Sequence, residues 1–194
     1  CEAAVGAQPA DPHLRYLFGR ALDAAGRAGE AVKAYQAAAD GGYVFAMFVL
    51  GNLYRQGEGV PVDHARALTL FGVALERGVA VAGGPLGAMH WRGEGTARNG
   101  TRAIETWRSA AAAGDPWSHR NLAWVAEIGR NGEQADPALA LRHYAVAVRL
   151  LERAGLDNED AAALRYRRAA LARLLGPETA ARAWLDALAA VPAR

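Results

Sequence analysis

The sequence predicts an all-α fold of stacked antiparallel helix pairs, and three observations lead to this prediction. The chain of 194 residues is rich in Ala and only 8% aromatic, a composition that favours helices in close contact. Residues with high β propensity are too few and too scattered for a sheet. Sequence motifs recur with a period of 36 residues, which indicates a repeat architecture.

Each repeat divides into two predicted helices. In the first half, residues 50–59 read LGNLYRQGEG, residues 86–95 read LGAMHWRGEG, and a third copy runs from Leu122 to Gly129. The second half places small, aromatic and small residues at positions i, i+4 and i+7, which form one face of a helix. These residues are Ala67, Phe71 and Ala74; Ala103, Trp107 and Ala110; and Ala140, Tyr144 and Ala147.

Gly and short polar residues predict where these helices end and begin. The first helix should end at a Gly, which adopts the left-handed conformation of a C-cap without steric cost. The second should follow Asp or Asn, whose side chain accepts hydrogen bonds from free backbone N–H groups. The expected C-caps are Gly57, Gly93 and Gly129, and the expected N-caps are Asp63, Asn99 and Asp136.

Small residues predict close contact between the helices, with aromatic rings filling the remaining space. The small residues are Gly51, Gly87, Ala74 and Ala110, and the rings are Tyr54, Phe71 and Trp107. One segment conflicts with the helical pattern, because Gly83-Gly84-Pro85 falls inside the expected first helix of its repeat. Proline inside a helix removes a donor and clashes with the preceding turn, so this helix should start near Pro85 or bend there.

These motifs resemble the Sel1-like repeat family, a branch of the tetratricopeptide-like helical repeats. Residues 44–79 follow the family pattern almost throughout. Residues 80–115 depart at His90 and Thr96, and residues 116–154 carry Asn131 in place of the second loop Gly. The resemblance implies a right-handed α-solenoid of about five helix pairs, in which a terminal pair shields the last apolar face.

The expected organisation assigns each segment to one unit. The segments are 1–11, an N-terminal helix remnant or lipoprotein tether; 12–43, a tetratricopeptide-like unit; 44–79 and 80–115, two Sel1-like repeats; 116–154, a degenerate repeat with a long second helix; and 155–194, a capping helix pair. Cys1 leaves two interpretations open: a fragment boundary, or the lipidated first residue of a mature bacterial lipoprotein. The second interpretation favours the periplasm or envelope over the cytoplasm.

Composition and motifs argue against several classes of function. A net charge of +2 is too small to indicate nucleic-acid binding by charge alone. A single Cys excludes an internal disulfide framework, and no apolar run is long enough for a transmembrane helix. The five His residues form no metal-binding motif, and no nucleophile motif is present. We therefore expect no catalytic residues, metal or cofactor.

The resemblance implies a binding groove on the concave face, formed by the first helix of each pair. The family's groove positions correspond here to His13, Tyr16, Arg20, Phe48, Asn52, Arg55, Trp91, Arg92, Arg120 and Trp124. Arg binds carboxylates through paired hydrogen bonds and aromatic rings supply apolar anchors. The expected partner is therefore another protein, or an acidic or C-terminal peptide.

Three functions remain open from the sequence. The first is a non-catalytic interaction scaffold or adaptor, as the resemblance implies. The second is a regulatory or recognition segment of a larger bacterial enzyme, for example a peptidase. The third is a peptidoglycan- or glycan-binding envelope lipoprotein that uses exposed Trp side chains. The sequence specifies neither the partner nor the oligomeric state.

Overall fold

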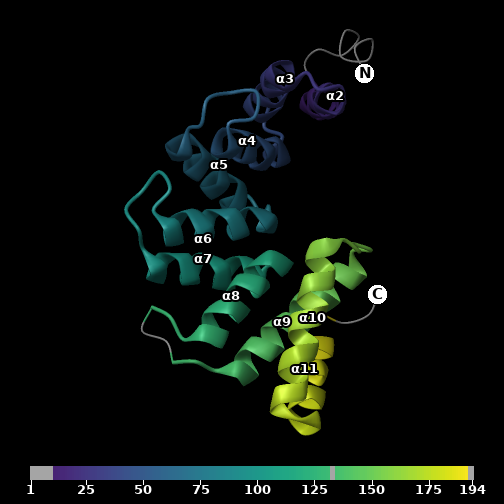
Figure 1. The fold of residues 1–194 in the computed structure, drawn as a ribbon. Helices are drawn as coiled ribbons and strands as arrows, with labels where there is room; N and C mark the ends of the chain where they lie inside the picture. The colour runs from purple at the N-terminus through teal and green to yellow at the C-terminus, as the bar shows by residue number, and fades with distance from the viewer. Residues whose placement is uncertain (1–10, 132–133, 192–194) are drawn as a thin grey trace. The chain divides into compact units, whose positions relative to one another are not determined.

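The computed structural model describes residues 11–131 and 134–191, and every regular element in these ranges is helical (Figure 1). The all-α prediction is thereby confirmed. Contacts divide the chain into two units, Cys1–Asn99 and Gly100–Arg194.

The first unit is built from successive helix pairs. Helix α2 (Pro12–Ala24) packs on α3 (Ala28–Asp40), and α4 (Val44–Gln56) packs on α5 (His64–Glu76). A short 3-10 turn, η1 (Ala80–Ala82), leads into α6 (Gly83–Arg92). The core of this unit includes buried rings and aliphatic side chains from each helix, among them Tyr35, Leu50, Phe71 and Met89.

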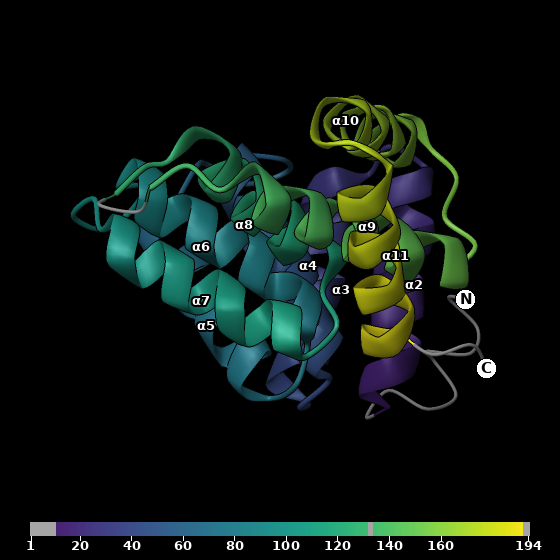
Figure 2. The same ribbon diagram turned by 90° about the horizontal axis from the view of Figure 1, so that it is seen from below.

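The second unit contains α7 (Gly100–Ala112), α8 (Pro116–Ile128), α9 (Pro137–Arg153), α10 (Glu159–Leu175) and α11 (Pro177–Ala190). The predicted long helix after Asp136 is α9, which has 17 residues. The two C-terminal helices pack more extensively on α9 than on each other (Figure 2). This arrangement follows from α9 itself, which buries Tyr144 and Leu151 in one cluster and Val146 in another.

The helix boundaries confirm the predicted caps. The C-caps Gly57, Gly93 and Gly129 all adopt positive φ angles of 77°, 78° and 60°. The Asp63 carboxylate accepts a hydrogen bond from the Arg66 backbone N–H at 2.9 Å. Helices α5, α7 and α9 begin directly after the predicted N-cap residues.

The conflict at Pro85 is resolved by an early helix start. Helix α6 begins at Gly83, so Pro85 is its third residue. The first four N–H groups of a helix have no partner within the helix, so a missing donor costs nothing there. The prediction of a start near Pro85 is confirmed, and the helix has only 10 residues.

Glycine on the first helix of a pair lets an aromatic ring of the second helix lie against its backbone. A Cβ atom added at Gly19 would lie 2.7 Å from the Tyr35 ring, and one added at Gly51 would lie 2.7 Å from the Phe71 ring. Both rings are almost fully buried. No larger side chain fits at these glycines without separating the helices.

The second glycine of each loop packs on the start of an earlier helix. A Cβ atom at Gly59 would lie 2.5 Å from the Ala28 carbonyl carbon, and one at Gly95 would lie 2.6 Å from that of His64. Both glycines have a φ of 70°. At both positions the lack of a side chain therefore permits the left-handed backbone conformation and the close contact with the start of the earlier helix.

The third loop reverses this arrangement. Asn131 replaces the loop glycine and adopts a φ of 60°, a conformation that Asn tolerates better than most residues. Its side chain lies over Gly100 at the start of α7, where an added Cβ would be 2.7 Å from the Asn131 Cγ atom. The Asn131 amide also donates to the Thr101 hydroxyl at 3.3 Å. Gly100 thus makes room for the side chain that the loop has gained.

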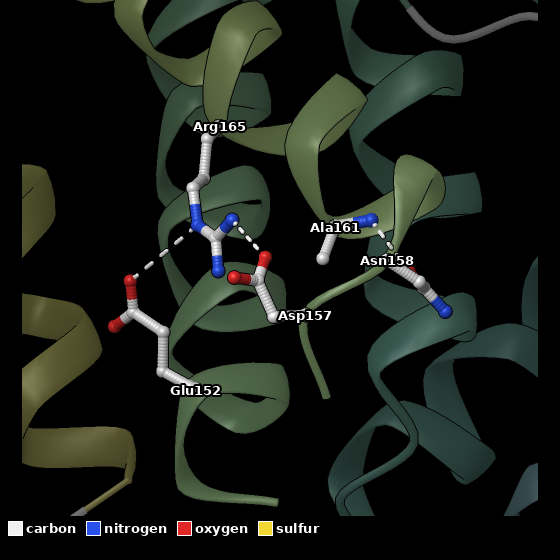
Figure 3. A network of polar contacts seen from close by, with 5 residues as sticks. All are labelled: Glu152, Asp157, Asn158, Ala161 and Arg165. Atoms are coloured by element: carbon white, nitrogen blue, oxygen red, sulfur yellow. Dashed lines mark hydrogen bonds and ion pairs between the residues drawn. The ribbon is translucent and has the colours of Figure 1, made fainter. Parts of the chain in front are cut away.

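Polar contacts fix the turn between α9 and α10 (Figure 3). The Asn158 side chain accepts a hydrogen bond from the Ala161 N–H at 3.0 Å. The Arg165 guanidinium binds Asp157 at 2.7 Å and reaches Glu152 at 3.9 Å. Because Asp157 is 80% exposed, the N-cap stabilises this turn more than the ion pairs do.

We predict that Gly51→Ala destabilises the first unit by about 1–2 kcal/mol, because the new methyl group overlaps the Phe71 ring. Thermal unfolding followed by circular dichroism measures the effect. Gly72→Ala is the matched control, since a Cβ at Gly72 meets no atom within 4 Å. This control should stabilise α5 by about 0.5–1 kcal/mol. Equal effects of the two substitutions would contradict the packing argument.

A second prediction concerns the exchanged pair at the third loop. Gly100→Ala should destabilise the chain by about 1–3 kcal/mol, because its methyl group collides with the Asn131 side chain. In the Asn131→Gly background, the same change should cost less than about 0.5 kcal/mol. Urea unfolding of the two single variants and the double variant measures the coupling. An equal cost in both backgrounds would show that Gly100 is needed for another reason.

Candidate functional site

The second unit contains a pocket of about 290 Å³ formed by α8, α9 and α10. It brings together two residues of the predicted groove, Arg120 and Trp124, with side chains that the sequence did not assign to a site. The lining residues are Arg120, Asn121, Trp124, Tyr144, Asp160, Ala163, Leu164 and Arg167. We call this the Arg120 pocket.

One wall of the Arg120 pocket is a chain of polar contacts. The Tyr144 hydroxyl donates to Glu127 Oε2 at 3.0 Å, and the other carboxylate oxygen accepts from Arg167 Nη1 at 2.8 Å. Burial raises the pKa of Tyr144, and the hydrogen bond to Glu127 raises it further. Tyr144 therefore remains a neutral donor, and Arg167 is held in place by an internal partner.

Arg120 differs from Arg167 because no carboxylate of the described residues lies within ion-pair distance of it. Its guanidinium lies 5.3 Å from the Trp117 ring centroid, and its Nη2 is 3.5 Å from the Asn121 Oδ1 atom. A guanidinium stacked on an aromatic face keeps its in-plane N–H donors accessible. The Arg120 guanidinium therefore lies beside an aromatic ring and an amide oxygen rather than in an ion pair with a described carboxylate.

The remaining lining residues limit what the pocket accepts. Trp124 is half-buried, and Arg130 lies 5.7 Å from its ring centroid. Leu164 supplies an apolar surface, and Asp160 adds an exposed negative charge. The pocket therefore combines two basic side chains, one exposed acidic side chain and apolar surface from Trp124 and Leu164.

The structure places the other predicted groove residues in the first unit. Tyr16 is buried, with its ring centroid 4.8 Å from that of Tyr43 and 5.7 Å from that of Tyr35. It is a core residue with only 8% of its surface exposed, and we leave it out of the proposed site. His13 is exposed, with its ring centroid 5.3 Å from that of Tyr43.

Helix α4 carries three of the predicted residues, and all three are half-buried. Phe48 packs 5.4 Å from Phe45 and 6.1 Å from Phe71 between ring centroids. The Asn52 amide donates to the Phe48 carbonyl at 3.2 Å. The Nε atom of Arg55 is enclosed without a hydrogen-bond partner in the described part of the chain.

The last three residues of the predicted set in this unit lie on α2 and α6. Arg20 is exposed on α2. Arg92 is exposed and forms an ion pair with Glu94 at 3.3 Å. Trp91 is half-buried, and Arg98 lies 5.9 Å from its ring centroid. The predicted groove set is therefore divided between two units.

The sequence missed the contribution of the second helices and of α10. Arg167 and Leu164 lie outside the repeat register, so counting positions from each Leu-Gly pair does not reach them. One sequence signal could have indicated the polar wall of the pocket. In two helix pairs, an acidic residue near the end of the first helix accompanies a Tyr on the second helix, as Asp23 with Tyr35 and Glu127 with Tyr144. In both pairs the Tyr hydroxyl donates to the acid.

The described residues were also compared with the requirements of a metal site and of a membrane-spanning helix. Within residues 11–131 and 134–191, no three His, Cys, Asp or Glu side chains are grouped so as to hold a metal ion. No helix in these ranges has the length and apolar character needed to cross a membrane. Cys1, the predicted lipidation residue, lies outside the described residues.

The fold and the site define a helical repeat protein. A model of the Sel1 repeat matches residues 44–79, 86–115 and 118–155, which is more than half of the chain, and the chain belongs to this family. Sel1 repeat proteins are typically protein-interaction scaffolds. The family resemblance predicted from the sequence is confirmed.

Two solved structures share the fold. A Sel1 repeat protein from Oxalobacter formigenes is 24% identical with a TM-score of 0.62, and the match covers 92% of this chain and 87% of the other. A protective antigen of uropathogenic Escherichia coli with an SLR fold is 22% identical with a TM-score of 0.63, and the match covers 92% of this chain and 46% of the antigen. The curated proteins contain no significant match.

We predict that Tyr144→Phe destabilises the second unit by about 0.5–1.5 kcal/mol, because Glu127 loses a hydrogen bond from a buried hydroxyl. Chemical unfolding compares this variant with Tyr166→Phe, whose parent side chain is 74% exposed. The control should change the free energy of unfolding by less than about 0.5 kcal/mol. Equal, negligible effects would show that the Tyr144 hydroxyl contributes nothing to the wall of the pocket.

Proposed function

We propose that this chain is a non-catalytic adaptor that binds a partner protein through an acidic segment. Its principal contact is the Arg120 pocket, where the segment places a carboxylate against Arg120 and an apolar side chain against Trp124 and Leu164. The observation that carries the proposal is the Arg120 guanidinium, which lies 5.3 Å from the Trp117 ring centroid and has no carboxylate of the described residues within ion-pair distance.

The electrostatics favour a carboxylate at Arg120 rather than at Arg167. Arg167 already forms an ion pair with Glu127, so a ligand carboxylate that bound to Arg167 would have to displace Glu127. Arg120 is half-buried, which reduces competition from water without enclosing the charge. A charge-assisted pair in this setting is stronger than one between two fully exposed side chains.

The first unit offers secondary contacts to the same class of ligand. Arg20 and His13 are exposed on α2, and Phe45 is 37% exposed on α4. Basic and aromatic groups occur together here as they do in the Arg120 pocket. We propose that these residues form a separate, weaker contact for an acidic segment, because their charges are solvated.

The test is the affinity for a fluorescein-labelled acidic peptide that carries one aromatic residue beside its Glu residues. Arg120→Glu should weaken binding by about tenfold or more, since it replaces an attraction by a repulsion. The matched control is Arg182→Glu, which introduces the same charge at an exposed site on α11 outside the pocket. Fluorescence anisotropy at two salt concentrations measures both variants.

A second peptide with Gln in place of Glu checks the role of the carboxylates. It should bind wild-type protein about tenfold more weakly or worse. If the Gln peptide or the Arg120→Glu variant binds as tightly as the parent, the Arg120 pocket is not the site. If the Arg182→Glu control loses as much affinity as Arg120→Glu, only non-specific attraction remains.

A further inference from the structure

The second unit contains a pair of histidines that no predicted site includes. The Nδ1 atoms of His119 on α8 and His143 on α9 are 3.0 Å apart. Their ring centroids are 5.2 Å apart. This distance exceeds the distance between the two Nδ1 atoms by about twice the radius of an imidazole ring. The rings therefore meet nearly head-on. One Nδ1 donates a hydrogen bond and the other accepts it.

This pair lines a second cavity, of about 350 Å³. Its wall is mainly aliphatic and includes Leu122, Val146, Leu150 and Val191, and Arg108 of α7 also lines it. We call this the histidine pocket. No lining residue is shared with the Arg120 pocket, and no acidic side chain is among those that line it.

The charges near the pair are positive. Burial lowers the pKa of His143 to about 4, and His119, Arg142 and Arg108 all act in the same direction. Burial also lowers the pKa of His119, against the opposing effect of the Ala111 carbonyl. Both rings therefore favour the neutral state at pH 7, and the neighbouring charges that act on His143 are positive.

The other polar groups on the packed helices already have partners. Arg142 binds Asp186 of α11 at 2.8 Å, and Arg149 of α9 donates to the Val191 carbonyl at 3.4 Å. Asp115 at the start of α8 accepts hydrogen bonds from the Trp117 and Ser118 backbone. No acid among these groups is left to neutralise the histidine pair.

We propose that the histidine pocket binds the free C-terminus of a partner chain that ends in an aliphatic residue. The terminal side chain fills the aliphatic wall, and the terminal carboxylate lies against the His119–His143 pair. This proposal adds a second site to the adaptor and does not depend on the Arg120 pocket.

Size and charge together argue for this occupant. The volume is near the small end of the range for ligand pockets, and it is large enough for an aliphatic terminal residue together with the residue before it. The positive surroundings complement a carboxylate. A terminal residue supplies both groups on adjacent atoms, which an internal residue of a peptide does not.

The pair can also accept, from solution, a proton that stabilises a bound carboxylate. In the neutral pair, a single added proton goes to Nε2 of the ring whose Nδ1 already donates, so the hydrogen bond between the rings survives. The new N–H then donates to the carboxylate. Because an adjacent anion raises the pKa of an imidazole, binding should take up protons, and affinity should rise as the pH falls from 7.5 to 5.5.

The test uses N-acetyl-leucine and its carboxamide as probes of the whole chain by isothermal titration calorimetry. The acid should bind at pH 6 with a dissociation constant on the order of 0.1–1 mM, and the carboxamide should bind at least about tenfold more weakly. Titrations in buffers of different ionisation enthalpy should show proton uptake for the acid alone. Equal binding of acid and carboxamide, or no binding of either, would overturn the proposal.

Variants and a second ligand locate the site and identify its occupant. His143→Gln should abolish the proton uptake, whereas His64→Gln, in the first unit, should leave it unchanged. Arg120→Glu should retain binding of N-acetyl-leucine even if it loses the acidic peptide, which separates this proposal from the previous one. A tripeptide ending in Leu should bind more tightly than octanoate, and the opposite order would reject a protein C-terminus as the occupant.

Discussion

The fold depends on contact between an aromatic ring and a helix backbone that carries no side chain at that point. Tyr35 lies against Gly19, and Phe71 lies against Gly51. In the second unit, buried Ala123 stands at the corresponding position of α8 and Tyr144 is buried on α9. This contact brings the two helices of a pair together and fills the space between them with one large ring.

Contacts of this kind explain why so much of the fold was predictable. The rings and small residues keep a fixed spacing, and the caps Gly57 and Asp63 lie at the boundaries that this spacing implies. The site was less predictable, because the repeat pattern predicts only contacts between helices that belong to repeats. Helix α10 has no register, yet its Leu164 and Arg167 complete the Arg120 pocket. The family resemblance also implies a place for Tyr16 in the groove, whereas the neighbouring rings bury it.

Departures from the repeat pattern occur as matched changes within one unit. The loop that gains the Asn131 side chain packs on a helix that begins with Gly100. Where the second helix has Tyr35 or Tyr144, the first helix supplies Asp23 or Glu127 to accept from the hydroxyl. Phe71 has no hydroxyl, and the position that corresponds to Asp23 in that repeat is Arg55. Such pairs preserve close packing because each polar group that is buried brings its own partner.

The same geometry lets α8 and α9 carry two pockets of different chemistry. Consecutive residues of an α-helix point about 100° apart, so His119 and Arg120 line different cavities, as His143 and Tyr144 do. The small residue Ala123 and the Tyr144 ring maintain the pairing of the helices from within the core. The basic, aromatic pocket and the aliphatic, imidazole-lined pocket share no lining residue, so a substitution in one leaves the lining of the other unchanged.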